Sequence, residues 1–136
     1  MICLDTNAVI MAINRRKPAV RQRLEAALAA GTTVGVPTVV LFEVRHGIAK
    51  SARPKDNTAI LAAFLASEVV RWPFEQEDAA EAGEIRATLE RSGTPIGPYD
   101  LLIAAQARRR GAVLVTADTG EFLRVPGLAV EDWASA

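Results

Sequence analysis

The segment MICLDTNAVI (residues 1–10) places a carboxylate between two apolar runs. Its first four residues have the length and character of a short buried strand. Asp5 follows at once, and the second apolar run begins at Ala8, which leaves no room for a loop. An acid in this position either caps a helix that starts behind it or belongs to a binding site at the end of the strand.

Other short, almost unbroken apolar runs resemble this first one. The expected strands are residues 1–4, 33–36, 69–72, 113–116 and 128–130. Helical patterns alternate with them, at residues 18–30, 37–50, 57–66, 77–91 and 98–110. This alternation predicts an α/β fold with a central parallel sheet of about five strands, flanked by helices on both faces. We expect residues 1–136 to form a single domain.

The composition excludes several classes of protein. No apolar run reaches the roughly 20 residues that a membrane-spanning helix needs, and the N-terminus lacks the features of a secretory signal. We therefore expect a cytoplasmic protein that is not bound to a membrane. Cys3 is the only cysteine, so we expect neither a disulfide framework nor a thiolate metal site.

The charge is distributed unevenly, although the net charge is zero. Residues 1–60 hold nine Lys and Arg against four Asp and Glu, whereas residues 61–136 hold seven against twelve. A basic face of this kind can contact nucleic acid, and it can also be an ordinary solvated surface.

Glu43 is an acid on an apolar helix face. It lies four residues after Val39, three after Val40 and four before Gly47, so at helical spacing it points in the same direction as residues expected to be buried. Burying a carboxylate is costly unless it is paired, protonated or bound to a cation. The alternative is a side chain that bends towards solvent or pairs with an arginine.

Asp100 and Asp118 are also acids whose positions require an explanation. Asp100 opens an apolar helix and shares a face with Ile103 and Ala104, although it can also favour the helix dipole. Asp118 follows the apolar strand at 113–116, as Asp5 follows the first strand. With Glu121 it can also form a capping box for a short helix.

Sheet topology can bring Asp5, Glu43, Asp100 and Asp118 to one edge. Four carboxylates in a small site raise one another's pKa, and a divalent cation relieves that repulsion. The chain has one histidine and one cysteine, so the expected ions are Mg²⁺ or Mn²⁺ bound by oxygen. Such a site can activate water and neutralise charge on a phosphoryl group.

Four ordered motifs resemble those of the PIN-domain ribonucleases, in particular the VapC toxins of bacterial type II toxin–antitoxin modules. The motifs are LDTNAVI (4–10), PTVVLFEVRHGI (37–48), PYDLLIAAQA (98–107) and LVTADTGEFLRVPGLAVEDW (114–133). The resemblance implies that the catalytic and metal-binding acids are Asp5, Glu43, Asp100 and Asp118. It implies a supporting role for Thr6 and Asn7, which would orient Asp5 or the water of the ion. Glu121 matches a less regular polar position around the acids, where it could bind a second ion or only cap the short helix.

The same resemblance implies an activity and partners. The activity is Mg²⁺-dependent endonucleolytic cleavage of structured RNA (tRNA or rRNA) by a metal-activated water, with Mn²⁺ able to substitute. The implied assembly is a homodimer neutralised by a cognate VapB-type antitoxin. Candidates for contacts to the RNA backbone are Arg15, Arg16, Lys17, Arg21, Arg45, Lys50 and Arg53.

Two other functions remain open from the sequence. A metal-independent ribonuclease could pair Glu43 with His46, three residues apart on one helix face, and EDTA would not inhibit it. A catalytically inactive PIN-fold module could instead bind only a protein partner, although the presence of all four acids argues against it. A phosphatase of the haloacid dehalogenase type is excluded because its second Asp is replaced by Asn7.

Overall fold

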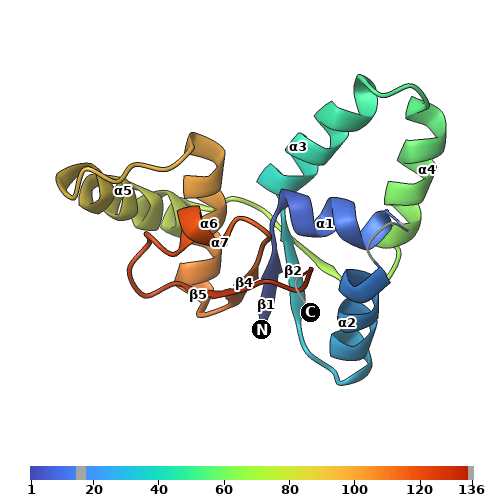
Figure 1. The fold of residues 1–136 in the computed structure, drawn as a ribbon, viewed down its shortest axis with the longest axis horizontal. Coiled ribbons are helices and arrows are strands. Elements are labelled where there is room, and N and C mark those ends of the chain that lie inside the picture. The colour runs from blue at the N-terminus through green and yellow to red at the C-terminus, as the bar shows by residue number, and fades with distance from the viewer. Residues whose placement is uncertain (15–17, 135–136) are drawn as a thin grey trace.

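The computed structural model describes residues 1–14 and 18–134. A five-stranded parallel sheet lies at its centre, in the order β3-β2-β1-β4-β5 (Figure 1). The strands are β1 (Ile2–Leu4), β2 (Val34–Pro37), β3 (Val70–Trp72), β4 (Val113–Val115) and β5 (Ala129–Glu131). The predicted α/β sheet is confirmed, and each strand begins and ends within one residue of its predicted bounds.

Helices cover both sides of the sheet, with α1 and α2 on one side and α5 and α6 on the other (Figure 1). The helices in the described part of the chain are α1 (Thr6–Ile13), α2 (Pro18–Ala29), α3 (Thr38–Ala49), α4 (Pro54–Leu65), α5 (Gln76–Arg91), α6 (Pro98–Arg110) and α7 (Thr119–Phe122). The prediction for α4 was wrong at its start, which lies three residues earlier than expected. Pro54 occupies the first turn, where its missing N–H costs no hydrogen bond.

The core explains why the strands have no polar alternation. Cys3, Leu4, Val36 and Leu114 are completely buried, because helices pack on both faces of the sheet. Cys3 is a free cysteine within this core. In the described part of the chain, no helix combines the length and apolar character needed to cross a bilayer.

An ionic network attaches α6 to α5 and β3. The buried Asp78 accepts hydrogen bonds from Arg109 Nε at 2.6 Å and Arg110 Nη1 at 2.9 Å, and the Arg110 guanidinium lies 4.7 Å from the centre of the Trp72 ring. Burial alone would raise the pKa of Asp78, but the hydrogen bonds from Arg109, the Glu75 backbone and Arg110 outweigh it and hold that pKa below its usual value. The carboxylate therefore stays charged, and the C-terminal end of α6 is held in place.

Candidate active site

The candidate site lies where the order of the strands reverses. From β1 the chain builds β2 and β3 on one side, and β4 and β5 on the other. Ligands of open parallel sheets bind beyond the carboxyl ends of the strands at such a point. Asp5 directly follows β1, and Asp118 comes three residues after the end of the neighbouring β4.

Asp5 has both a structural role and an unusual environment. Its Oδ1 accepts a hydrogen bond from the Ala8 N–H at 2.8 Å and so caps α1. The residue is only 3% exposed. Burial is the main reason why its pKa is raised to about 6, and the charges of Asp118 and Glu43 add to the effect despite hydrogen bonds from Thr116 and Ala8. A helix cap alone does not account for this crowding of acids.

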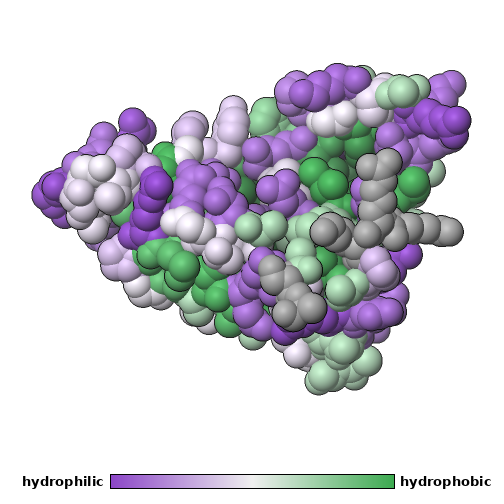
Figure 2. Space-filling model, viewed as in Figure 1, coloured by the Kyte–Doolittle hydropathy of each residue, from purple (hydrophilic) through white to green (hydrophobic). Residues whose placement is uncertain are grey.

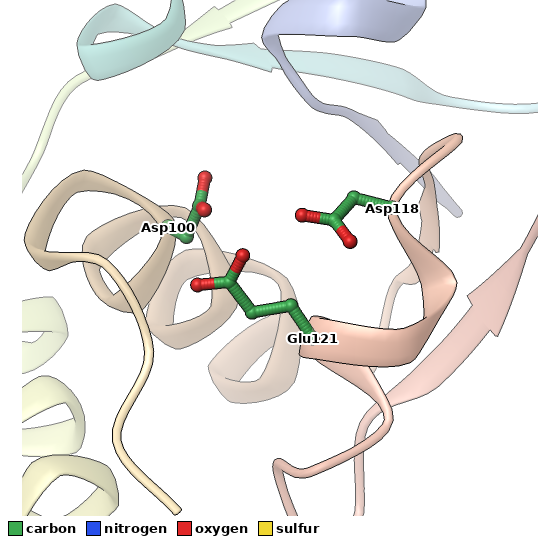
Figure 3. Close-up of side chains that lie close together, drawn as sticks. All are labelled: Asp100, Asp118 and Glu121. Atoms are coloured by element: carbon green, nitrogen blue, oxygen red, sulfur yellow. The ribbon is translucent and has the colours of Figure 1, made fainter.

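Three further carboxylates converge beside it (Figure 3). Oxygens of Asp100, Asp118 and Glu121 all lie within 4.8 Å of one another, and they come from the first turn of α6, the N-cap of α7 and α7 itself. Burial raises the pKa of Asp100 to about 7, and repulsion from Glu121, Glu43, Asp5 and Asp118 contributes. Asp118 and Glu121 belong to one short segment, whereas Asp100 lies on a different helix, so the proximity of Asp100 to the other two is a property of the tertiary fold.

Glu43 reaches the same region from α3. Its Oε1 accepts a hydrogen bond from the Thr6 hydroxyl at 2.6 Å, and its charge contributes to the raised pKa values of Asp5 and Asp100. The ion pairs among the described residues do not include Glu43. Pairing with an arginine of the described residues is therefore not what offsets its partial burial.

The capping box suggested by the spacing of Asp118 and Glu121 does not form. The Asp118 side chain makes no capping hydrogen bond, and Glu121 Oε1 instead accepts the Gly97 N–H at 2.7 Å. Gly97 immediately precedes α6, so this bond attaches α7 to the start of the helix that carries Asp100. The sequence left open whether Glu121 binds an ion or only caps the helix, and the structure places its carboxylate beside those of Asp100 and Asp118.

The remaining predicted residues differ in their surroundings. Thr6 contacts Glu43, whereas Asn7 and Arg45 are exposed on α1 and α3. His46 is exposed, and its ring stacks beside Phe42 with centroids 6.4 Å apart. No hydrogen bond between Glu43 and His46 is present among the described residues. The predicted RNA contacts at residues 15–17 (Arg15, Arg16 and Lys17) lie outside the described residues.

Thr116 was missed by the sequence reasoning. It is 1% exposed, donates a hydrogen bond to the Asp5 carboxylate, and accepts the Asp118 N–H at 2.8 Å. A hydroxyl can donate and accept at the same time, so one side chain links the ends of β1 and β4. The sequence signal that could have identified it is its position: Thr116 is a polar residue at the end of an apolar strand, two residues before Asp118.

The cluster offers only oxygen ligands. His46, the sole histidine, is exposed on α3, and Cys3 is buried within β1. Carboxylate oxygens are the ligands that Mg²⁺ and Mn²⁺ prefer. The residues present therefore fit a hard divalent cation.

Known proteins are similar to this chain in sequence and fold. The family model of the PIN domain matches residues 2–128. The chain is 40% identical over 131 residues to the tRNA(fMet)-specific endonuclease VapC of Shigella flexneri, and the match covers 96% of each protein. The chain belongs to the VapC ribonucleases of the PIN-domain family. The family resemblance read from the four motifs is thus confirmed.

Two further comparisons agree with this family. The tRNA(fMet)-specific endonuclease VapC of Salmonella typhimurium is 37% identical over 130 residues, which cover 96% of each protein. A chain in the crystal structure of VapBC2 from Rickettsia felis, bound to a DNA fragment from their promoter, matches with a TM-score of 0.90 and 36% identity. That match covers 98% of this PIN-domain chain and 99% of the other.

Proposed function

We propose that this PIN-domain chain is a Mg²⁺-dependent endoribonuclease toxin that cleaves structured RNA, and that Mn²⁺ can replace Mg²⁺. The observation that carries the proposal is the convergence of acids from four separated segments at the point where the strand order reverses. Two similar proteins are named as tRNA(fMet)-specific endonucleases, which favours tRNA over rRNA as the substrate. The proposal also holds that the protein consists of a single domain, forms a homodimer and is cytoplasmic.

The side chains divide into those that bind the cation and those that hold the binding groups. Asp5, Glu43, Asp100 and Asp118 would hold the ion, and Glu121 lies close enough to join them. When bound, the ion would lower the pKa of a water molecule and neutralise charge on the phosphodiester.

Hydroxyl groups hold two of these acids in place. Thr6 orients Glu43, and Thr116 orients Asp5. Asn7 lies beside Thr6 in the first turn of α1, and Arg45 is available on α3 for the RNA backbone.

Chelation tests the metal dependence. Purified chain, freed of any partner, should cleave unfractionated tRNA in Mg²⁺ or Mn²⁺, and cleavage should stop in EDTA and return with excess Mn²⁺. Gel analysis of the RNA gives the readout. Unchanged cleavage in EDTA would support the Glu43 and His46 alternative, and no cleavage with any cation would support the non-catalytic module.

Metal affinity should depend on pH. In the metal-free protein the pKa of Asp5 is about 6 and that of Asp100 about 7, so both carboxyls hold protons in mild acid that a cation must displace. The affinity for Mn²⁺ should rise by roughly tenfold or more from pH 5.5 to about pH 8 and level off above that pH. Calorimetric titration measures it, with Glu84→Gln on the exposed face of α5 as the control. An affinity independent of pH would contradict the protonated state of these acids.

We further propose that a small VapB-type antitoxin binds a groove between α1, α2, α3 and α4. The groove has a volume of about 1080 Å³, and Figure 2 shows apolar surface in the hollow between α3 and α4. Its apolar lining includes Ile10, Ile13, Leu24, Leu28, Ile60 and Phe64. An amphipathic helix can bury its apolar face in such a groove, and a nearby Arg of the antitoxin could pair with the acid cluster and exclude the cation.

A charge placed in the groove tests this partner. Ile60 is 45% exposed, so Ile60→Asp should leave the fold intact while it buries an unpaired charge in the complex. After coexpression with the antitoxin encoded beside the gene, the variant should no longer co-purify with a tagged antitoxin. Val70→Asp is the matched control, since Val70 in β3 is also 45% exposed. Retention of the complex by Ile60→Asp would place the antitoxin elsewhere.

A further inference from the structure

The exposed aromatic side chains are gathered in one place. Among the Phe, Tyr and Trp residues, all of which lie in the described ranges, only Phe42 and Tyr99 are exposed, at 53% and 47%. Their ring centroids are 5.5 Å apart and the rings meet edge to face at 61°. The His46 ring lies nearly parallel to Phe42, with an interplanar angle of 10°. We call Phe42, His46 and Tyr99 the aromatic platform.

The aromatic platform adjoins the acid cluster. Phe42 immediately precedes Glu43 in α3, and Tyr99 immediately precedes Asp100 in α6. Consecutive Cα atoms are about 3.8 Å apart, so the two rings start one residue from two of the acids. The same pair of neighbouring helices thus presents carboxylates into the site and aromatic rings at its edge.

Core packing does not explain the platform. The other Phe and Trp side chains are buried or partly buried, whereas Phe42 and Tyr99 are each about half exposed and His46 is exposed as well. Positive charge lies beside it, because Arg45 follows Phe42 by three residues and shares its helix face. Exposed rings next to a cation and a phosphodiester-cleaving site fit a nucleotide, whose base stacks while its phosphate meets the charge.

We propose that the aromatic platform stacks an unpaired RNA base next to the phosphodiester that is cleaved. The proposal rests on the ribonuclease function proposed above and adds a binding subsite to it. Sequence-specific proteins bind RNA mostly at loops and bulges, whose bases are free to stack on aromatic side chains. The platform would place one such base and thereby set which phosphodiester reaches the acids.

The test begins with wild-type protein and unfractionated tRNA in Mn²⁺. The cleavage site found there defines a synthetic RNA stem–loop, on which KM and kcat are measured for all variants. Phe42→Ala and Tyr99→Ala should each raise KM by about tenfold with a smaller change in kcat, because a base stacked on one aromatic ring contributes on that order. Val70→Ala removes a similarly exposed apolar side chain from β3 and should behave as wild type. Tyr99→Phe keeps the ring, so its KM should fall below that of Tyr99→Ala.

A second substrate separates stacking from a structural effect. A stem–loop that lacks the base flanking the cleaved bond should raise the KM of wild type by about tenfold and leave that of Phe42→Ala unchanged. If the shortened substrate raises KM equally for wild type and Phe42→Ala, or if Phe42→Ala has the KM of wild type on the full stem–loop, base stacking on the platform is refuted. The proposed ribonuclease function is unaffected by either result. No tRNA cleavage by wild type would overturn both. A change in oligomeric mass without a change in KM would assign the rings to contacts between copies and refute stacking.

Discussion

Asp100→Asn should lower RNA cleavage by about a hundredfold or more. The carboxylate lies within 4.8 Å of Asp118 and Glu121 and senses the charges of Glu43 and Asp5, so it stands at the centre of the acid cluster. Asparagine has nearly the same shape but lacks the charge that a divalent cation requires, and losing one such electrostatic contact costs on the order of two to three decades of rate. Initial rates on tRNA in saturating Mn²⁺ give the measurement, with Glu84→Gln as the control.

The same substitution should not weaken the fold. The pKa of Asp100 is about 7 in the folded, metal-free protein and about 3.9 in an unfolded chain. The folded state binds this proton more tightly, so the associated stability is complete below about pH 4 and is lost as the pH rises through about 7. Asparagine cannot lose a proton, so the variant should melt with or above wild type at pH 8 in EDTA. A large fall in melting temperature would instead mean that Asp100 is a structural helix-start residue.

Gly35→Ala should disrupt folding. Gly35 lies in the middle of β2, and a Cβ at this position would fall 2.0 Å from Cε2 of the buried Trp72 ring in β3. Trp72 cannot move aside easily, because its face meets Arg110 and its carbonyl accepts a hydrogen bond from Gln106. Overpacking a core typically costs about 1–3 kcal/mol, and a clash with a rigid indole should exceed that range.

Gly83→Ala is the matched control for this prediction. Gly83 is exposed within α5, and a Cβ there would meet nothing within 4 Å. Replacing a glycine in a helix interior should stabilise the protein by roughly 0.5–1 kcal/mol. Urea unfolding of both variants measures the difference. Equal stability of Gly35→Ala and wild type would show that β2 and β3 can separate without cost.

The structural elements were predictable because their signals are local. Apolar runs and helical patterns located the ends of most strands and helices to within one residue. The start of α4 was predicted three residues too late, although proline is tolerated in the first turn of a helix. The short helices α1 and α7 were suggested only by Asp5 and Asp118, which were considered as possible helix caps.

The candidate site was predictable only as a set of acids. Asp5, Glu43, Asp100 and Asp118 could be selected because each stands at a strand end or on an apolar helix face, where a carboxylate requires an explanation. Neither Thr116 nor the central place of Glu121 followed from spacing. Thr116 connects two strands that are neighbours in the sheet but far apart in the chain, and Glu121 bonds to Gly97 across 24 residues.

The sequence by itself therefore determined the elements, the parallel sheet, the family and the four acids that mark it, because periodicity and short motifs act over a few residues. Only the tertiary structure decided which groups meet. The strand order joins the ends of β1 and β4, α7 carries Glu121 to Asp100, and α3 and α6 bring Phe42 against Tyr99. These contacts depend on how whole elements pack, and no local pattern of residues encodes the distance between two side chains on different elements.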